Sequence, residues 1–183
     1  GFAARESFTS VVANGYIYII GGINSGSTAL NTVQYAKILA NGNVGNWSTV
    51  ANLPAARDHA SAVFANGYIY VTGGATNETA ATAKNDVYYA KVPSDGNITS
   101  WTTSANPITQ ERWRHSSVVA NGYLYVIGGV YTDGNPKTTV YKSKLSPDGS
   151  NGTWSSAGTA LNTAVYSHAS AVANGYVYAI GGN

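Results

Sequence analysis

The chain has 183 residues, of which 44% are hydrophobic and 10% are charged, and its formal net charge is +2. So little charge excludes a disordered, solvating segment, and the small excess of Lys and Arg argues against nucleic acid as a partner. There is no cysteine, which excludes disulfides, thiolate metal sites and cysteine nucleophiles. The apolar runs fall short of the ~18 residues that a membrane span requires, so we expect a soluble chain.

A ten-residue string that begins Ala-Asn-Gly-Tyr and ends Gly-Gly occurs four times, at 13–22, 65–74, 120–129 and 173–182. Asn-Gly between two apolar runs is the strongest short signal for a β-hairpin, because a type I′ turn needs positive φ at both positions. Each copy therefore predicts two antiparallel strands joined at its Asn-Gly pair.

The segments between these hairpins also repeat. A Tyr-rich strand is expected at 33–39, 87–92 and 139–145, and each is followed by a polar turn and one Trp, at positions 47, 101 and 154. Two hairpins per unit make a four-stranded sheet of roughly 50 residues, which is the size of a propeller blade. The strands are apolar on both faces, as a blade between two neighbours requires, and no segment shows a helical period. The predicted fold class is all-β.

The Gly-Gly doublet followed by a spaced Tyr and Trp resembles the kelch repeat, over nearly the whole chain. The longer turns at 93–97 and 147–150 look like those of bacterial secreted or surface kelch proteins. The resemblance implies a single kelch-type β-propeller segment over 1–183, with repeats at approximately 5–56, 57–111 and 112–164 and a half repeat at 165–183. We therefore expect three four-stranded blades plus a half blade, whereas a closed propeller has about four to eight blades.

Such an open arc of blades leaves two blade faces bare. Each face would expose several Tyr, Ile and Val side chains, which is more contiguous apolar surface than monomers normally tolerate. We expect one of two situations: the chain is a stretch of a longer propeller, or copies of the chain associate into a homo-oligomer.

In kelch domains, ligands approach one mouth of the ring, which is built from two sets of loop residues. Residues of the first set stand eight positions before each hairpin Gly, and those of the second set stand one to three positions after each Gly-Gly. In this sequence the first set is Ser7, His59, Arg114 and Ser167, and the second is Asn24, Thr76, Asn77, Tyr131 and Asn183. This polar rim suits a hydrogen-bonding or anionic ligand, and the alternative is that these are ordinary loop residues of a scaffold.

Three arginines recur ten positions before the hairpin Gly, at Arg5, Arg57 and Arg112. Repetition in one register favours a structural role, so Arg114, which breaks the pattern, is the preferred ligand-binding cation. Trp113 lies beside it, outside the register of the other Trp residues. Its ring would stack on a sugar face in a binding role, or cover the loop as a hydrophobe with Arg side chains packed on it.

The sequence predicts no metal and no cofactor. His59, His115 and His168 do not share one register, which favours structural roles over joint ligation of an ion. Asp95 and Asp148 are expected to be turn residues, because neither is followed by the carboxylates that a calcium loop needs. Galactose oxidase, another kelch propeller, requires a Cys cross-linked to a Tyr, and this chain has no Cys.

The leading functional hypothesis is a non-catalytic binding or adhesion module of a secreted or cell-surface protein, which presents propeller loops to a protein or glycan ligand. The extracellular location is expected from the low charge and the abundance of Asn, Ser, Thr and Tyr. One alternative is a carbohydrate epimerase-like enzyme, for which Glu111, Arg114 and His59 form the candidate set. The other is a structural self-assembly unit that uses its exposed blade faces.

Overall fold

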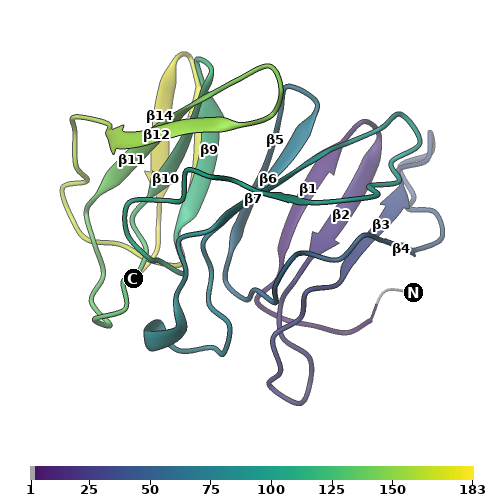
Figure 1. Cartoon of the computed structure of the whole chain (residues 1–183), viewed down its shortest axis with the longest axis horizontal. Coiled ribbons are helices and arrows are strands. Elements are labelled where there is room, and N and C mark those ends of the chain that lie inside the picture. Colours follow the sequence, from purple (N-terminus) through teal and green to yellow (C-terminus); the bar gives the residue numbers. More distant parts are fainter. Residues whose placement is uncertain (1–2) are drawn as a thin grey trace.

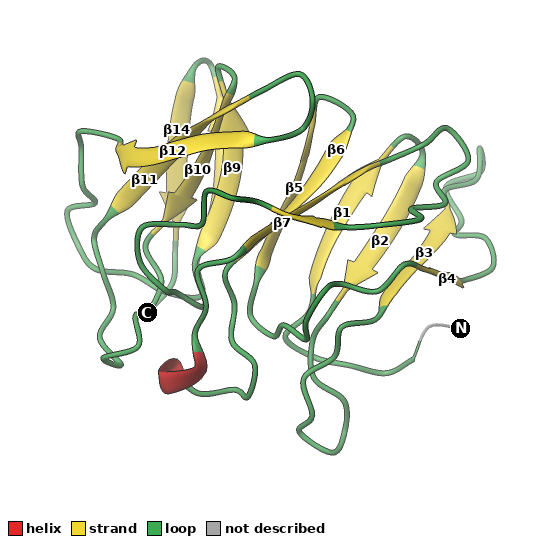
Figure 2. Cartoon of the chain, viewed as in Figure 1, coloured by secondary structure: helices red, strands yellow, loops and turns green. Residues whose placement is uncertain are grey.

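The computed structural model describes residues 3–183 and contains four antiparallel sheets (Figures 1 and 2). Three sheets have four strands in sequential order, and the last has two, which confirms three blades followed by a half blade. The first blade is β1 (Thr9–Ala13), β2 (Tyr16–Ile20), β3 (Val33–Lys37) and β4 (Ser48–Val50); the second is β5 (Ser61–Ala65), β6 (Tyr68–Thr72), β7 (Val87–Lys91) and β8 (Thr102–Thr103); the third is β9 (Ser116–Ala120), β10 (Tyr123–Ile127), β11 (Val140–Leu145) and β12 (Asn151–Ser156); the half blade is β13 (Ala169–Ala173) and β14 (Tyr176–Ile180).

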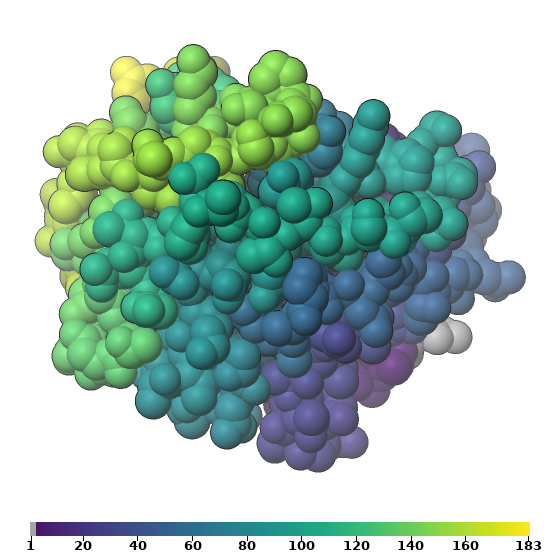
Figure 3. Space-filling model, in the orientation of Figure 1, coloured from purple at the N-terminus to yellow at the C-terminus, as the bar shows by residue number. Residues whose placement is uncertain are grey.

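The blades follow one another along the long axis of the molecule, from the purple N-terminal blade to the yellow C-terminal hairpin (Figure 1). The same progression of colours crosses the surface in the space-filling view (Figure 3). The first strands of successive blades are neighbours, since β1 contacts β5, β5 contacts β9, and β9 contacts β13. Within residues 3–183 the one helical element is a 3₁₀ turn at Ala80–Thr82, and no helix of this part could span a membrane.

All four Asn-Gly pairs form the predicted hairpin turns. Asn14 has φ 50° and Gly15 has φ 81°, and the other three pairs repeat this positive-φ combination. Residues on either side of each pair face one another across the hairpin, as Ala13 and Tyr16 do. The turn chemistry therefore sets the register in which the first two strands of every blade pair.

Successive blades pack face to face through their alternating strand residues. Tyr18 and Ile20 of the first blade share a buried cluster with Ile69 and Val71 of the second. A second cluster joins Tyr70 of the second blade to Leu124 and Val126 of the third, among others. Both faces of the central strands are thus buried, which explains why they are apolar without alternation.

The outward faces of the first blade and of the half blade lack this cover. Val12 is 56% exposed on β1, and Tyr178 and Ile180 are 45% and 56% exposed on β14. The residues that correspond to Tyr178 in the first two blades, Tyr18 and Tyr70, are both completely buried. The difference follows from the position of each blade in the arc. An inner blade has a neighbour on both sides, whereas an end blade has a neighbour on one side only.

Candidate functional site at the mouth of the arc

The first set of predicted mouth residues lies together, along a line of backbone hydrogen bonds that crosses the blades. The N–H of His59 donates to the carbonyl of Ser7 (2.8 Å), that of Arg114 to His59 (3.1 Å), and that of Ser167 to Arg114 (2.8 Å). All four residues have left-handed backbone conformations, with φ between 47° and 55°. This conformation is costly for residues with a Cβ, and at His59, Arg114 and Ser167 it turns the loop so that its amide group reaches the preceding blade.

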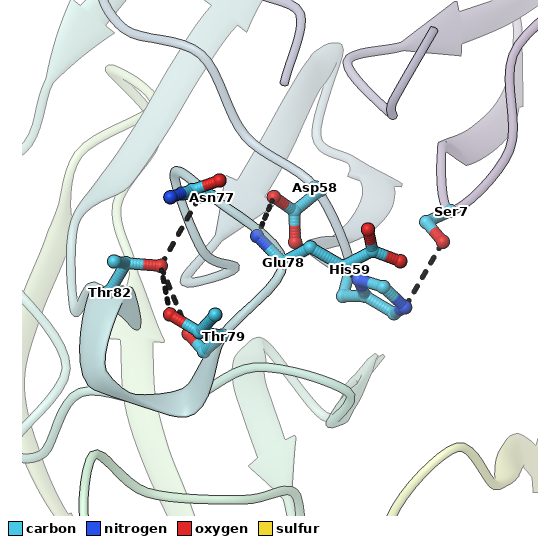
Figure 4. Close-up of polar contacts among 7 residues, drawn as sticks. All are labelled: Ser7, Asp58, His59, Asn77, Glu78, Thr79 and Thr82. Atoms are coloured by element: carbon cyan, nitrogen blue, oxygen red, sulfur yellow. Dashed lines mark hydrogen bonds and ion pairs between the residues drawn. The ribbon is translucent and has the colours of Figure 1, made fainter. Parts of the chain in front are cut away.

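Ser7, His59 and Asp58 form a hydrogen-bonded chain across the first two blades (Figure 4). The Ser7 Oγ lies 3.0 Å from Nε2 of His59, and Nδ1 of His59 lies 3.0 Å from Oδ1 of Asp58. Asp58 is fully buried. An ionised carboxylate accepts hydrogen bonds and cannot donate them, so Asp58 favours the tautomer with a proton on Nδ1. In that tautomer, Nε2 of His59 accepts a hydrogen bond from the Ser7 hydroxyl, and the imidazole is fixed in orientation.

The loop between β6 and the 3₁₀ turn at Ala80–Thr82 supports this chain from the other side. The backbone N–H of Glu78 donates to Oδ2 of Asp58 over 3.0 Å (Figure 4). The preceding N–H, of Asn77, donates to the Thr82 hydroxyl over 3.2 Å, and that hydroxyl donates to the carbonyl of Thr79. Through these hydrogen bonds, Asp58 connects the His59 side chain to the loop that follows the second Gly-Gly.

Arg114 supplies a positive charge at the mouth. Its guanidinium carbon lies 4.3 Å from the centre of the Trp113 ring and 6.0 Å from that of Tyr166. Its Nε is buried and has no hydrogen-bond partner. Among the residues described, no hydrogen bond or ion pair engages the Arg114 guanidinium. Arg114 is thus a half-buried cation that is oriented by aromatic rings and whose charge is not neutralised by an acidic side chain.

Trp113 lies beneath Arg114 rather than at the surface. It is 7% exposed and belongs to a buried cluster with Ala75, Ala83 and Val130. The His59 ring meets it edge-on, with 5.0 Å between ring centres. Because the guanidinium lies over its face, the indole has no exposed ring face on which a sugar could stack. Of the two expected roles, the structure assigns Trp113 that of a packed hydrophobe with an Arg on it.

The second set of predicted residues stays within separate loops. Asn24 caps its own turn, since its Oδ1 accepts the N–H groups of Gly26 and Thr28, both at 3.0 Å. A hollow of about 180 Å³ opens beside it, next to Arg5 and Glu6. The N–H of Thr76 donates to the carbonyl of Thr82, and Asn183 exchanges two backbone hydrogen bonds with Tyr166. These residues shape the loops around the mouth.

Tyr131, the exposed aromatic expected at the rim, is half-buried and held by neighbouring groups. Its hydroxyl accepts a hydrogen bond from Nη2 of Arg112 (2.9 Å) and bonds to the Thr139 hydroxyl (2.8 Å). The charged groups of Arg112 and Lys137 each lie 4.9 Å from the ring centre. Tyr131 thus connects its loop to the buried arginine of its own blade.

The three arginines in common register bind backbone and neighbouring side chains within the fold. Arg5 and Arg112 each donate from Nη1 to the carbonyl of the first Gly of their own doublet, at 2.9 Å to Gly21 and 3.0 Å to Gly128. Arg57 forms an ion pair with Asp86 and a 2.6 Å hydrogen bond to the Tyr88 hydroxyl. Their side chains are committed to the fold, as the repetition indicated.

His115 and His168 also connect adjacent blades. Nε2 of His115 lies 2.9 Å from the Thr72 hydroxyl, and Nε2 of His168 lies 2.6 Å from the Ser116 hydroxyl. Burial is the main cause that lowers the pKa of both imidazoles, which therefore stay neutral. In the described part of the chain no three His, Asp or Glu side chains come together in a way that could hold a metal ion.

Sequence reasoning missed two residues of the mouth, Asp58 and Tyr166. Both stand nine positions before their hairpin Gly, in a register where the four repeats carry Glu6, Asp58, Trp113 and Tyr166. Each forms a backbone bridge to the residue after Gly-Gly, as Asp58 does with Ala75. The signal was this shared register, because a position next to the mouth residues in every repeat must also lie near the mouth.

The residues proposed for an epimerase do not form one cluster. Across residues 3–183, no hydrogen bond or ion pair joins Glu111 to His59 or Arg114, and Glu111 is exposed. His59 is instead paired with Ser7 and Asp58. The candidate set of Glu111, Arg114 and His59 is therefore not joined into one hydrogen-bonded site.

Comparison with known families and proteins supports the repeat assignment. A family described as the KLHDC2/KLHL20/DRC7 Kelch-repeats domain matches residues 2–183. An F-box/kelch-repeat protein of Arabidopsis thaliana is 31% identical over 140 residues, which cover 73% of this chain and 34% of that protein. The kelch-like protein terF of Aspergillus terreus is 30% identical over 139 residues, which cover 70% of this chain and 28% of terF.

Among solved structures, that of YjhT superposes with a TM-score of 0.69 at 21% identity, over 91% of this chain and 55% of YjhT. The superposition shows a shared fold. The chain thus spans about a third of each of these two kelch proteins and about half of this structural neighbour.

Proposed function

Because this chain belongs to the kelch-repeat family, whose repeat domains are protein-interaction modules, we propose that its mouth binds an acidic group on a partner protein, with Arg114 as the anchor. The observation that carries this proposal is the half-buried guanidinium without an acidic partner among the described residues, whose carbon lies over the Trp113 ring at 4.3 Å from its centre. The fork of a guanidinium matches the two oxygens of a carboxylate.

A protein ligand is favoured over a glycan by the burial of Trp113. Sugar binding relies on exposed aromatic faces, and this indole is 7% exposed beneath the guanidinium. Around Arg114, the fixed imidazole of His59 and the hydroxyls of Ser7 and Ser167 supply hydrogen-bonding groups that suit a peptide backbone next to the acidic group. The rim as a whole thus selects an acidic side chain in an extended segment.

The test is an array of synthetic peptides rich in Asp and Glu, printed beside the same peptides with Asn and Gln in their place. The fluorescently labelled chain is expected to bind a subset of the acidic peptides at least about tenfold more tightly than their amide counterparts, because a hydrogen bond to a charged group is worth about 1.5–3 kcal/mol. Arg114→Gln should abolish this difference, and Arg114→Lys should retain part of it.

Lys144→Gln is the matched control, because it removes the same charge from an exposed position on β11. It should leave the preference for acidic peptides unchanged. The proposal is wrong if acidic and amide peptides bind alike, if Arg114→Gln binds as wild type does, or if no peptide binds above background. The extracellular location expected from composition stays a prediction, which antibody labelling of intact source cells would test.

A further inference from the structure

Three imidazoles of the chain make the same contact with the preceding repeat, through Nε2 and a hydroxyl. The pairs are His59 with Ser7 (3.0 Å), His115 with Thr72 (2.9 Å) and His168 with Ser116 (2.6 Å). Among the described residues, Nδ1 of the last two imidazoles is buried without a hydrogen-bond partner. Of the three, His59 alone has a carboxylate at Nδ1, because Oδ1 of Asp58 lies 3.0 Å away. A hydroxyl, an imidazole and a carboxylate in this order match a nucleophilic serine, its general base and the acid that orients the base.

Both oxygens of the Asp58 carboxylate have partners, which fixes the direction of the hydrogen bonds. Asp58 is completely buried, with Oδ1 at Nδ1 of His59 and Oδ2 accepting the N–H of Glu78 over 3.0 Å (Figure 4). Because an ionised carboxylate only accepts, the imidazole donates from Nδ1 and directs the lone pair of Nε2 at the Ser7 hydroxyl. His59 is therefore held in the tautomer that can remove the proton of Ser7.

The Ser7–His59 pair is also the most accessible of the three. The His59 side chain is 15% exposed and Ser7 is half-buried, whereas His115 and His168 are both buried. The contact crosses the junction between the first and second blades, at the mouth of the arc. The hydroxyl that has a base and an acid behind it is thus the one that a substrate from solvent can approach.

A cation without an acidic partner belongs to the same group of contacts. The N–H of Arg114 donates to the carbonyl of His59 (3.1 Å), and the Arg114 guanidinium carbon lies 4.3 Å from the centre of the Trp113 ring. The His59 ring meets that same indole edge-on at 5.0 Å between ring centres. Arg114 is therefore the cation available here to stabilise negative charge that develops on an acyl oxygen.

We propose that Ser7, His59 and Asp58 form a nucleophile–base–acid triad that cleaves a small carboxylic ester, an activity beyond the binding function proposed above. The Ser7 Oγ attacks the acyl carbon while Nε2 of His59 takes the hydroxyl proton. The bond from the acyl carbon to the alcohol oxygen breaks, and the alcohol leaves with the proton from Nε2. Water then attacks the acyl-serine, gives a proton to Nε2 and releases the carboxylic acid, and the proton returns to Ser7 Oγ. Asp58 stays ionised throughout and acts as a positioning residue.

The first experiment uses a fluorophosphonate, which forms a bond from phosphorus to an activated serine oxygen and loses fluoride. Peptide mass spectrometry of the labelled chain gives the rate at each serine. Ser167 is the internal reference, because it has the same register and left-handed conformation as Ser7 and is exposed, whereas the neighbouring His168 bonds to Ser116 instead. Ser7 should be labelled at least about a hundredfold faster than Ser167, since a positioned general base contributes about 10²–10⁴-fold.

Variants then assign the roles, with p-nitrophenyl acetate hydrolysis as the second measurement. Ser7→Ala should lose both the label at this position and hydrolysis above the buffer rate. His59→Gln should lower both by about a hundredfold or more. Ser155→Ala removes an exposed hydroxyl on β12 and is the matched control, which should behave as wild type. Thermal unfolding establishes that each variant is folded.

The positioning role of Asp58 has a spectroscopic test that a merely structural role would not satisfy. In Asp58→Asn, the amide oxygen must face the Glu78 N–H, so the NH₂ group faces Nδ1 of His59. The imidazole proton should then move to Nε2, which ¹⁵N NMR of the ring detects, and Ser7 labelling should fall with it. In wild type the same spectrum should show the proton on Nδ1.

Three results would overturn the proposal. The first is a wild-type chain in which Ser7 is labelled no faster than Ser167. The second is a folded His59→Gln variant that is labelled at Ser7 as fast as wild type, which would mean that the imidazole is not the base. The third is a wild-type ring proton on Nε2 of His59, which would make the imidazole a donor to Ser7 and the contact a structural one.

Discussion

His115 fills the junction between the second and third blades. Its Nε2 lies 2.9 Å from the Thr72 hydroxyl, and its Nδ1 is buried without a partner. Burial first, then the positive charge of Arg112 and the neighbouring His168 imidazole, hold the pKa of His115 well below its ordinary value. The folded protein therefore keeps this imidazole neutral where an unfolded chain would protonate it.

We predict that the protein loses stability as pH falls below the ordinary histidine pKa of about 6.5. The unfolded state then binds a proton that the folded state refuses, at a cost of about 1.4 kcal/mol per pH unit. The stabilisation is fully present above that pH. Thermal unfolding from pH 8 to 5 should show a melting temperature that falls by roughly 3–5 °C per pH unit on the acid side.

His115→Gln isolates this effect, because an amide can still bond to the Thr72 hydroxyl and does not titrate. As pH decreases, the melting temperature of the variant should fall less steeply than that of wild type. The fall that remains is due to His168, whose pKa burial also lowers. Above pH 7.5 the two curves should run parallel. An acid limb as steep as that of wild type would show that other groups control the acid sensitivity.

The glycine doublets lie where adjacent blades approach each other closely. Substituting such a glycine should therefore reduce stability for two reasons: its positive φ, and the contact of the new Cβ with the next blade. A Cβ on Gly73 would lie 2.6 Å from the Arg112 carbonyl and 2.8 Å from Cε1 of His115, at φ +54°. Gly134 has φ +77° in an exposed turn with nothing within 4 Å. Both positions have a positive φ that is unfavourable for alanine, but only Gly73 lies close to atoms of the next blade.

We therefore predict that Gly73→Ala destabilises the protein far more than Gly134→Ala. The left-handed conformation costs an alanine about 1–2 kcal/mol at either site. Overpacking against the next blade adds about 1–3 kcal/mol at Gly73 alone. Urea denaturation of the two variants measures this difference, and equal midpoints would mean that the blades can move apart without loss.

At the scale of secondary-structure elements, the sequence predicted the fold well. The Asn-Gly and Gly-Gly pairs recur at regular intervals, and these residues readily adopt the positive φ that the turns need. The first mouth set was carried over from the kelch resemblance, and its four residues lie side by side because they stand at equivalent positions of successive blades. The burial of Trp113 and the pairing of His59 with Asp58 did not follow. Both depend on which residues from other blades face each side chain, and a single repeat does not contain that information.

In the whole molecule, stability should decline toward the end of the arc, because repeat architectures are held by contacts between neighbouring units. Within residues 3–183, the half blade packs against the third blade on one side, and no strand pairs with the outer edge of β14. The corresponding hairpin of the third blade, β9–β10, has a blade or hairpin on both sides and is largely buried. Its opening requires the loss of more contacts.

Hydrogen exchange followed by NMR should reveal this gradient. At low protein concentration, the amides of β13 and β14 are expected to exchange at least about tenfold faster than those of β9 and β10, which corresponds to a local opening easier by about 1.4 kcal/mol or more. Equal protection of both hairpins at low concentration would instead mean that the arc unfolds as one cooperative unit, with its end as stable as its centre.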